Sequence, residues 1–418
     1  MERFLSGKAF ALEMDAKDPM RGLRDLFFLP TSLGGEGIYF CGNSLGLQPA
    51  SVPEYIEEEI QKWKSHAVEG HFTGKNPWFN YHKHFRKPFS HLCGCLEEEV
   101  VAMNSLTNNL HFLLVSFYRP DPKKFKVIIE QGSFPSDRYA IESQIKWHGF
   151  DPEKALIEIP PENEFLPTEK IITEIKNHQD ELALVLLPGI QYYTGQFLEV
   201  KAITKAAHEA GAYVGFDLAH AIGNVPLRLH EWKVDFAVWC NYKYINAGPG
   251  AVGGAFVHQD NFSENLPRLN GWWGQKESQR FEMGPEFTPM EGVDAWQQSN
   301  GNILSMAALR ASLEIFEKAG IQQLRAKSIL LTGYLEFLLK EEFNESLVRI
   351  ITPTDHSQRG AQLSVSVKDG KRVYEGLKQQ GIYLDWREPD VIRIAPTPLY
   401  NTFDEVYRFT EVLKKLIN

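Results

Sequence analysis

The stretch LALVLL, residues 182–187, constrains the fold of this chain more than any other feature. An uninterrupted apolar run of this kind is typical of a parallel strand that is covered on both faces. Residues 199–210 follow as a predicted amphipathic helix, and Gly211 suits its C-cap. Residues 212–217 predict a second buried strand. Strand, helix and strand at this spacing form a right-handed βαβ unit, so we expect an α/β fold with a mostly parallel sheet.

The same alternation extends in both directions, and the pattern changes after about residue 302. Before it we expect strands over 126–130, 234–239 and 254–258, and helices over 54–66 and 135–145. After it we expect helices over 303–318 and 321–342, a half-exposed strand over 361–367, and a closing helix from Phe403 with a capping box of Thr402 and Glu405.

This change of pattern predicts three parts of the chain. Residues 1–45 form an N-terminal segment that packs near the functional site and the small domain. Residues 46–301 form the large α/β domain, and residues 302–418 a smaller α+β C-terminal domain. Two domains are also the natural expectation for 418 residues.

Charge and cysteine content exclude several classes of protein. The net charge of -10 argues against nucleic acid or an acidic membrane surface as a partner. No stretch approaches the roughly 20 apolar residues of a membrane span, and the N-terminus lacks the apolar core of a signal peptide. We therefore expect a cytoplasmic protein. Its four cysteines are too sparse for a disulfide framework, and the lone Cys93-x-Cys95 pair does not predict a metal site.

The glycines of GPGAVG, residues 248–253, match the spacing of a dinucleotide-binding fingerprint. That fingerprint must lie between a strand and a helix, because the phosphates bind at the helix N-terminus. Here the next segment, residues 254–258, reads as a strand. The match is therefore accidental, and a nicotinamide-dependent oxidoreductase is not expected.

Polar residues at two strand ends carry the strongest chemical signal. Asp217 ends the strand YVGFD, and Lys243 follows the strand VDFAVW. Ligand groups in open α/β sheets lie at the carboxyl ends of the strands. A lysine amine and a carboxylate in one pocket suit pyridoxal phosphate, whose aldehyde forms a Schiff base and whose ring nitrogen pairs with an acid. Taken singly, such an aspartate more often caps a turn and such a lysine more often lies at the surface.

Two further segments fit the same cofactor. Leu106 and Thr107 stand at a predicted helix start, where free N–H groups bind phosphate, and Phe134 in FPSD could stack on a flat ring. Each segment alone is equally explained by ordinary helix capping. The order phosphate helix, aromatic loop, aspartate and lysine is that of fold-type I pyridoxal-phosphate enzymes.

Longer motifs make the resemblance specific. The chain resembles the kynureninase family over nearly its whole length, in the segment from Tyr213 to His258 and in YFCGNSLGLQP, GKNPW, FPSDRYA, YYTGQ, RLNGWWG and IRIAPTPLYN. The resemblance implies a fold-type I large domain with a smaller C-terminal domain, with Lys243 as the Schiff-base lysine and Asp217 as the partner of the ring nitrogen. It also implies a homodimer with the active site at the subunit interface, to which the second subunit contributes Trp272 and Asn300. The other cofactor residues that it implies are Leu106, Thr107, Phe134, Pro135, Ser136, Asp137, His220 and Tyr242.

The reaction that the resemblance implies is hydrolysis of kynurenine or 3-hydroxykynurenine to alanine and an anthranilate, in tryptophan degradation or NAD biosynthesis. Arg393 is the expected partner of the α-carboxylate, because a guanidinium binds a carboxylate through two parallel hydrogen bonds. Tyr242 is the expected proton donor or relay. The residues expected near the substrate ring are Ser44, His71, Trp273 and Asn300.

One departure and several rival functions remain open. Pro188 stands where the family often has Ser or Thr, which puts one hydrogen bond to the cofactor in doubt. A class V aminotransferase is a rival, whereas a cysteine desulfurase is disfavoured because no cysteine lies beyond residue 240. A catalytically silent cofactor-binding regulator is disfavoured because Lys243, Asp217 and Arg393 are all present.

Overall fold

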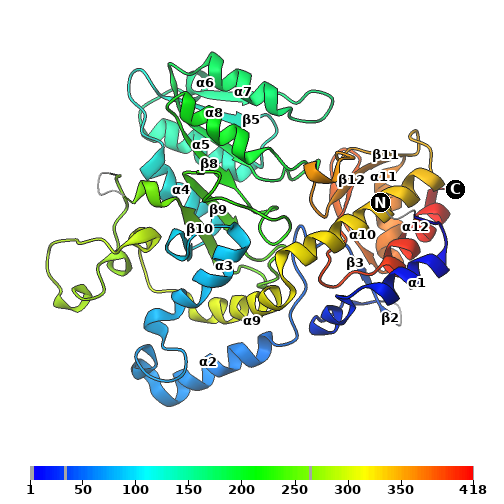
Figure 1. The fold of residues 1–418 in the computed structure, drawn as a ribbon, viewed down its shortest axis with the longest axis horizontal. Coiled ribbons are helices and arrows are strands. Elements are labelled where there is room, and N and C mark those ends of the chain that lie inside the picture. Colours follow the sequence, from blue (N-terminus) through cyan, green and yellow to red (C-terminus); the bar gives the residue numbers. More distant parts are fainter. Residues whose placement is uncertain (1–3, 33–34, 263–265, 418) are drawn as a thin grey trace.

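A seven-stranded sheet forms the centre of the larger lobe (Figure 1). The computed structural model describes residues 4–32, 35–262 and 266–417. Five neighbouring strands of the sheet are parallel, whereas β10 runs antiparallel to both of its neighbours, β9 and β4. The strand order is β4 (Val100–Ala102), β10 (Gly253–Val257), β9 (Phe236–Cys240), β8 (Tyr213–Asp217), β7 (Leu182–Pro188), β5 (Lys126–Glu130) and β6 (Leu156–Ile159).

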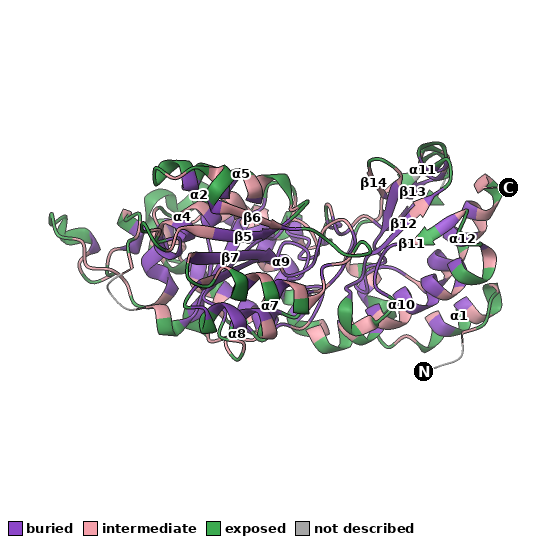
Figure 2. Cartoon of the chain, turned by 90° about the horizontal axis from the view of Figure 1, so that it is seen from above, coloured by how far each residue is buried: buried purple, intermediate pink, exposed green. Residues whose placement is uncertain are grey.

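Helices cover both faces of this sheet, and Figure 2 shows its central strand β7 as buried, whereas the outer strand β6 is mostly intermediate. Alternate residues of β7 enter opposite cores: Val185 and Leu187 pack on one side, Leu184 and Leu186 on the other. This alternation explains why the strand is apolar without interruption. The helices of this lobe are α3 (Arg86–Cys93), α4 (Leu106–Phe117), α5 (Pro135–Trp147), α6 (Pro152–Ala155), α7 (Thr168–Asn177) and α8 (Val200–Glu209).

Two helices, α9 (Ile303–Ala319) and α10 (Ile321–Glu342), lead from the larger lobe to the smaller one (Figure 1). Gly320 separates them with a φ of +74°, a conformation that favours glycine. α9 packs against α2 (Val52–His66). The smaller lobe has an antiparallel sheet in the order β11 (Val348–Ile350), β12 (Leu363–Val367), β15 (Val391–Ile394) and β14 (Asp385–Arg387), with α11 (Gly370–Gln379) and α12 (Phe403–Ile417).

The N-terminal segment packs on this smaller lobe. Helix α1 (Lys8–Lys17) lies against α12, and the Asp15 carboxylate accepts from the backbone N–H groups of Phe403 and Asp404 at 2.7 and 3.0 Å. A carboxylate at a helix N-terminus satisfies otherwise unpaired donors. Short strands follow: β1 (Thr31–Ser32) pairs with β2 (Gly35–Glu36), and β3 (Ile38–Tyr39) with β13 (Ile382–Tyr383). We propose that the chain divides into an N-terminal segment of residues 1–45, a large domain of residues 46–301 and a small domain of residues 302–418.

The predicted helices and strands are present, with shifts at their ends. The prediction that the strand over 361–367 is half-exposed was wrong, because β12 lies between β11 and β15 and even its Ser364 is buried, with its hydroxyl donating to the Tyr193 carbonyl. The capping box of α12 is formed, because the Thr402 hydroxyl and the Glu405 carboxylate each accept from the other's backbone N–H at 3.1 Å. The strand predicted over 361–367 begins only at Leu363, because the Ala361 N–H donates to the Asn224 side chain and not to the sheet. The glycines of GPGAVG lead into β10, as predicted, and not into a helix. No described helix is both long and apolar enough to cross a membrane.

Candidate active site

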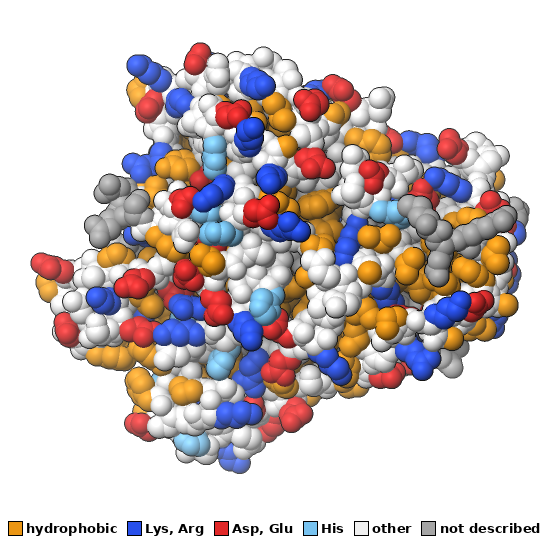
Figure 3. Space-filling view, in the orientation of Figure 1, with side chains coloured by type: hydrophobic (Ala, Val, Ile, Leu, Met, Phe, Trp, Pro, Cys, Tyr) orange, Lys and Arg blue, Asp and Glu red, His pale blue; other side chains and the backbone are white. Residues whose placement is uncertain are grey.

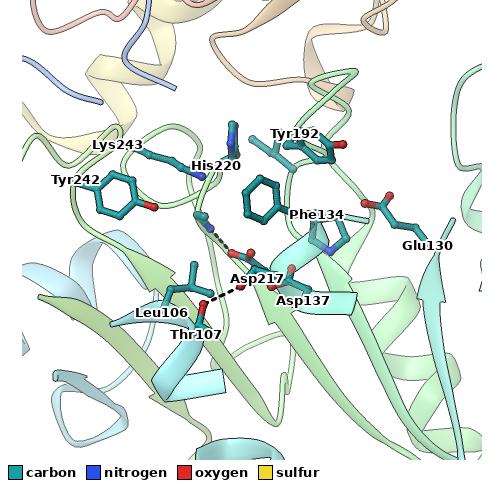
Figure 4. A pocket seen from close by; sticks show the side chains of 14 residues that line it. Leu106, Thr107, Glu130, Phe134, Asp137, Tyr192, Asp217, His220, Tyr242 and Lys243 are labelled. Carbon is teal, nitrogen blue, oxygen red and sulfur yellow. Dashed lines mark hydrogen bonds between the residues drawn. The ribbon is translucent and has the colours of Figure 1, made fainter. Parts of the chain in front are cut away.

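A pocket opens at the carboxyl ends of β5, β7, β8 and β9 (Figure 4). The carboxyl ends of parallel strands lie at the same end of the sheet, so residues far apart in the chain meet there. Nine of the residues expected to hold a cofactor line it: Leu106, Thr107, Phe134, Ser136, Asp137, Asp217, His220, Tyr242 and Lys243. Pro135 is the first residue of α5, between Phe134 and Ser136. The other lining residues are Glu130, Pro188, Ile190, Tyr192 and Ala219.

The loop after β9 holds Lys243 in this pocket. Asn241 is fully buried and fixes the loop, because its side chain accepts from Trp239 Nε1 at 3.0 Å and donates to the Val252 carbonyl at 2.7 Å. Gly46 packs directly against this loop. A Cβ added at Gly46 would come within 2.4 Å of the Lys243 carbonyl oxygen. Only glycine allows this approach.

The Lys243 amine is available for chemistry. Its Nζ lies 5.7 Å from the centroid of the Phe134 ring. No ion pair or hydrogen bond engages this amine within the described parts of the chain. In the view of Figure 4, Lys243 and Tyr242 lie on one side of the Phe134 ring and Glu130 on the other. A flat molecule above the ring would therefore face the amine.

Three buried carboxyl groups lie at the base of the pocket. Burial raises the pKa of Asp217, whose Oδ1 accepts from the Ala219 N–H at 2.7 Å, while the nearby charge of Lys243 opposes this rise. The pKa of Asp137 is raised by burial and by the charge of Asp217. Burial also raises the pKa of Glu130 to about 8, with a further contribution from Asp217. The cluster therefore favours a positively charged ligand atom.

Glu130 was missed by the sequence analysis, although the sequence carried a signal for it. It is the last residue of β5, and it ends the apolar strand KVIIE as Asp217 ends YVGFD. Gln191 Nε2 donates to its carboxylate at 3.5 Å. The rule that selected Asp217 therefore also selects Glu130.

The start of helix α4, beside Asp137 in Figure 4, suits a phosphate group. Helix α4 begins at Leu106, and Thr107 Oγ1 lies 2.9 Å from Ser136 Oγ at the start of α5. Two hydroxyls and the first N–H groups of a 12-residue helix offer donors to an anion. Thr107 was expected at the phosphate, and Ser136 was expected only as one of the cofactor residues.

The pocket fits pyridoxal phosphate by the chemistry of its side chains. It offers an amine, an aromatic face, a carboxylate for the ring nitrogen, and phosphate donors. His220 has an unsatisfied hydrogen-bonding atom, because its Nδ1 is buried and has no hydrogen-bond partner among the described residues. Burial, together with the charges of Lys243 and Arg393, places the pKa of His220 well below its ordinary value, so its ring is neutral. A bound ligand would supply the missing partner.

Arg393 borders the same pocket from the smaller lobe. Its Nη1 donates to the carbonyl of Tyr192, which lines the pocket, at 2.7 Å. Its Nη2 donates to Ser44 Oγ at 3.1 Å and contacts the Asp385 carboxylate. Two of the expected substrate-binding residues, Ser44 and Arg393, are therefore in direct contact.

Arg393 and Ser44 lie beside the pocket and are not among its lining residues, and the four remaining expected residues do not line it either. His71 is half-buried and ends a short helix, with its Nδ1 3.1 Å from the Val68 carbonyl. Trp273 is buried against Phe79 and is absent from the pocket lining, whereas Trp272 is 42% exposed. Asn300 is exposed. A single chain does not bring these four residues to Lys243.

Solved structures show the fold to which this architecture belongs. Cysteine desulfurase from Thermococcus onnurineus NA1 superimposes with a TM-score of 0.75 over 100% of this chain and 99% of that one, at 18% identity. The cystine C–S lyase C-DES, in a mutant with glycine linked to its PLP cofactor, gives 0.75 over 91% of this chain and 97% of that one, also at 18% identity. The expected fold-type I α/β class is thereby confirmed.

Sequence comparisons narrow the class to one family. The family "Kynureninase C-terminal domain" matches residues 324–413. Kynureninase from Myxococcus xanthus is 50% identical over 416 residues, 98% of this chain and 97% of that protein. Kynureninase from Flavobacterium psychrophilum is 48% identical over 412 residues, 97% of each. The chain belongs to the kynureninase family.

Proposed function

We propose that this chain is a pyridoxal-phosphate-dependent hydrolase that cleaves the bond between Cβ and Cγ of kynurenine, or of its 3-hydroxy form, to give alanine and an anthranilate. The identity of about half of all residues over nearly the full length with named kynureninases carries this proposal. When bound, the cofactor links to the substrate amine and withdraws electrons from its α-carbon. A class V aminotransferase is not favoured, because the matches at this level of identity are kynureninases.

Lys243 and Tyr242 are the proposed proton-transfer residues. Lys243 Nζ is unpaired above the Phe134 ring, so it can first hold the cofactor and then accept the α-proton once the substrate amine has replaced it. Burial raises the pKa of Tyr242 far above its ordinary value, so the phenol keeps its proton. It is therefore available to donate a proton to Cβ when the bond between Cβ and Cγ breaks, while a water molecule supplies the oxygen of the new carboxyl group on the anthranilate.

Arg393 is the proposed partner of the substrate α-carboxylate. Its guanidinium side chain is 1% exposed and is held by the Tyr192 carbonyl, so little freedom is lost when a carboxylate binds. Asp217 is the proposed partner of the ring nitrogen. Together these contacts fix both ends of the substrate–cofactor assembly.

The decisive experiment is to load the purified chain with pyridoxal phosphate and supply L-kynurenine. A yellow protein that releases fluorescent anthranilate and L-alanine in equal amounts supports the proposal. Transfer of the amino group to a keto acid, without anthranilate, would identify an aminotransferase. Cofactor binding without turnover of either kind would identify a regulator.

We also propose a homodimer whose partner supplies Trp272 and Asn300. Phe72, Trp272, Phe281 and Met283 form an exposed apolar face, with 53%, 42%, 54% and 70% of their surface accessible. Ring contacts at 5.5 Å (Trp272–Phe281) and 6.1 Å (Phe72–Phe281) make this face continuous. Exposed apolar patches of this kind mark interaction sites.

Sedimentation equilibrium is expected to give twice the mass of one chain. Phe281→Asp should yield monomers that bind pyridoxal phosphate more weakly, because the phosphate loses its second-subunit contacts. A monomer with full turnover would contradict this proposal.

Other partners and the location remain as expected from the sequence. On the face shown in Figure 3, Lys and Arg side chains are interspersed with Asp and Glu and form no continuous basic surface. This mixture, with a net charge of -10, supports a small-molecule substrate and not a nucleic acid partner. We propose a cytoplasmic location for the same enzyme.

His71 is proposed to accept a hydrogen bond from the ring hydroxyl of 3-hydroxykynurenine. With Nδ1 donating to Val68, its Nε2 is left as an acceptor for a phenol. His71→Phe is expected to lower the preference for 3-hydroxykynurenine over kynurenine by about tenfold, the effect of one lost buried hydrogen bond. The ratio of the two kcat/KM values measures this preference. The matched control is His66→Phe, at an exposed histidine nearby; an unchanged ratio in both variants would exclude this role.

A further inference from the structure

The guanidinium that is proposed to bind substrate already holds a carboxylate of its own chain. Asp385 on β14 stands directly opposite Arg393 on β15 in the antiparallel register. Arg393 Nη2 and Ser44 Oγ both contact the same atom, Asp385 Oδ2. Two residues expected to bind substrate thus converge on one internal carboxylate oxygen.

A second guanidinium engages this oxygen from the side nearer to solvent. Arg387 Nη2 lies 3.1 Å from Asp385 Oδ2. The Arg387 side chain is 37% exposed, whereas those of Asp385 and Arg393 are 11% and 1% exposed. The Asp385 carboxylate therefore bridges a deeply buried cation and a more accessible one.

The charges of this group do not balance. Two guanidiniums share one carboxylate, and no other carboxylate forms an ion pair with either arginine in the described parts of the chain. The neighbouring titratable side chains do not supply a second negative charge. Burial raises the pKa of the Cys41 thiol to about 11 and raises the pKa of the Tyr244 phenol, and His220 is neutral. One positive charge is left for an incoming anion.

Arg393 also retains donors for such an anion. Its Nε is buried without a hydrogen-bond partner, and so is Arg387 Nε. An unpaired buried N–H costs free energy that a ligand carboxylate would recover. The site therefore has charge and donors for a second carboxylate. The Asp385 carboxylate, however, already contacts Arg393, the more buried of the two guanidiniums.

We propose that Asp385 is an internal placeholder for the substrate α-carboxylate and determines how strongly the enzyme selects ligands that carry one. This inference rests on the proposed function, in which Arg393 binds that carboxylate. Asp385 keeps the buried guanidinium in position while the site is empty. When substrate binds, two carboxylates at one guanidinium repel each other, and Asp385 gives way toward Arg387.

The test compares L-alanine, which has the carboxylate, with L-alaninamide, which lacks the charge. Both are titrated by calorimetry into the pyridoxal-phosphate-loaded protein. Asp385→Asn and Asp385→Ala should each tighten alanine binding relative to alaninamide binding by about tenfold, because the competing charge is removed. The measured ratio is the dissociation constant of alaninamide divided by that of alanine, so the expected effect is a rise of this ratio; general effects on the amine end of the site cancel in it.

Asp390→Asn is the matched control. It removes one negative charge from the same lobe, where Asp390 accepts from the Ser366 hydroxyl at 2.6 Å and makes no ion pair with Arg393. Its ratio should stay within about twofold of wild type, since a distant charge is screened.

An unchanged or lowered ratio in both Asp385 variants would overturn the placeholder role, and so would loss of the native circular dichroism spectrum in both. The proposed function is judged separately, from release of anthranilate by the wild type. A wild type that cleaves kynurenine, with an unchanged ratio in both variants, overturns this inference alone.

Discussion

Lys243→Ala is expected to reduce the turnover of kynurenine by at least about 10⁴-fold, the upper range for loss of a positioned base. Lys243 is the only lysine among the residues that line the pocket. Its amine has two proposed tasks, to link the cofactor and to move the α-proton, and alanine performs neither. The measurement is the rate of anthranilate release by the loaded variant, followed by fluorescence.

Chemical labelling separates this role from a general loss of structure. Borohydride reduction of the native, yellow protein should fix the cofactor to the peptide that contains Lys243. Lys233→Ala is the matched control, because that lysine pairs with Asp260 at 3.0 Å on the surface and should leave turnover unchanged. Labelling of any other lysine would contradict the assignment.

Periodicity made the fold of the larger lobe predictable from the sequence. The run LALVLL has no polar residue because β7 lies between two neighbouring strands and beneath helices on both faces. A strand in that position requires apolar side chains on both of its faces. The start of the strand predicted over 361–367 was less predictable, because the Ala361 N–H donates to the Asn224 side chain and not to the sheet.

Residues at strand ends were predictable for a similar reason. Asp217 is the last residue of the apolar strand β8, and Lys243 lies in the loop after the apolar strand β9; the parallel order of the sheet brings them together. The contact of Asp385 with Arg393 was not predictable in this way. It depends on the register of β14 against β15, and a shift by one residue would place the carboxylate on the other face of the sheet.

The positions of the residues expected near the substrate ring could not be obtained from one chain. His71, Trp273 and Asn300 lie on the larger lobe, yet none of them lines the pocket. The family resemblance supplied their expected role, and neither periodicity nor spacing contains that information. Their function therefore depends on the proposed subunit interface.

The second large effect is expected at Asp217. Asp217→Asn should lower turnover by about 10²- to 10⁴-fold, as expected when a buried charge no longer stabilises the charge that develops in the reaction. A carboxylate beside the ring nitrogen holds a proton on that nitrogen by Coulomb attraction in a site with low dielectric constant. An asparagine has nearly the same shape and no charge. The measurement is kcat for kynurenine, together with the absorbance spectrum of the bound cofactor.

Glu130→Gln is the matched control for this substitution. Glu130 belongs to the same buried cluster, but burial raises its pKa to about 8. Because this pKa lies above neutral pH, the carboxyl group is mostly protonated at pH 7, and glutamine removes little charge there. Its loss of turnover should therefore be far smaller than that of Asp217→Asn. Above pH 8 the wild-type Glu130 ionises, so any difference between wild type and Glu130→Gln should grow as the pH rises. Equal losses in the two variants at pH 7 would show that the shape of the cluster matters, and not the charge of Asp217.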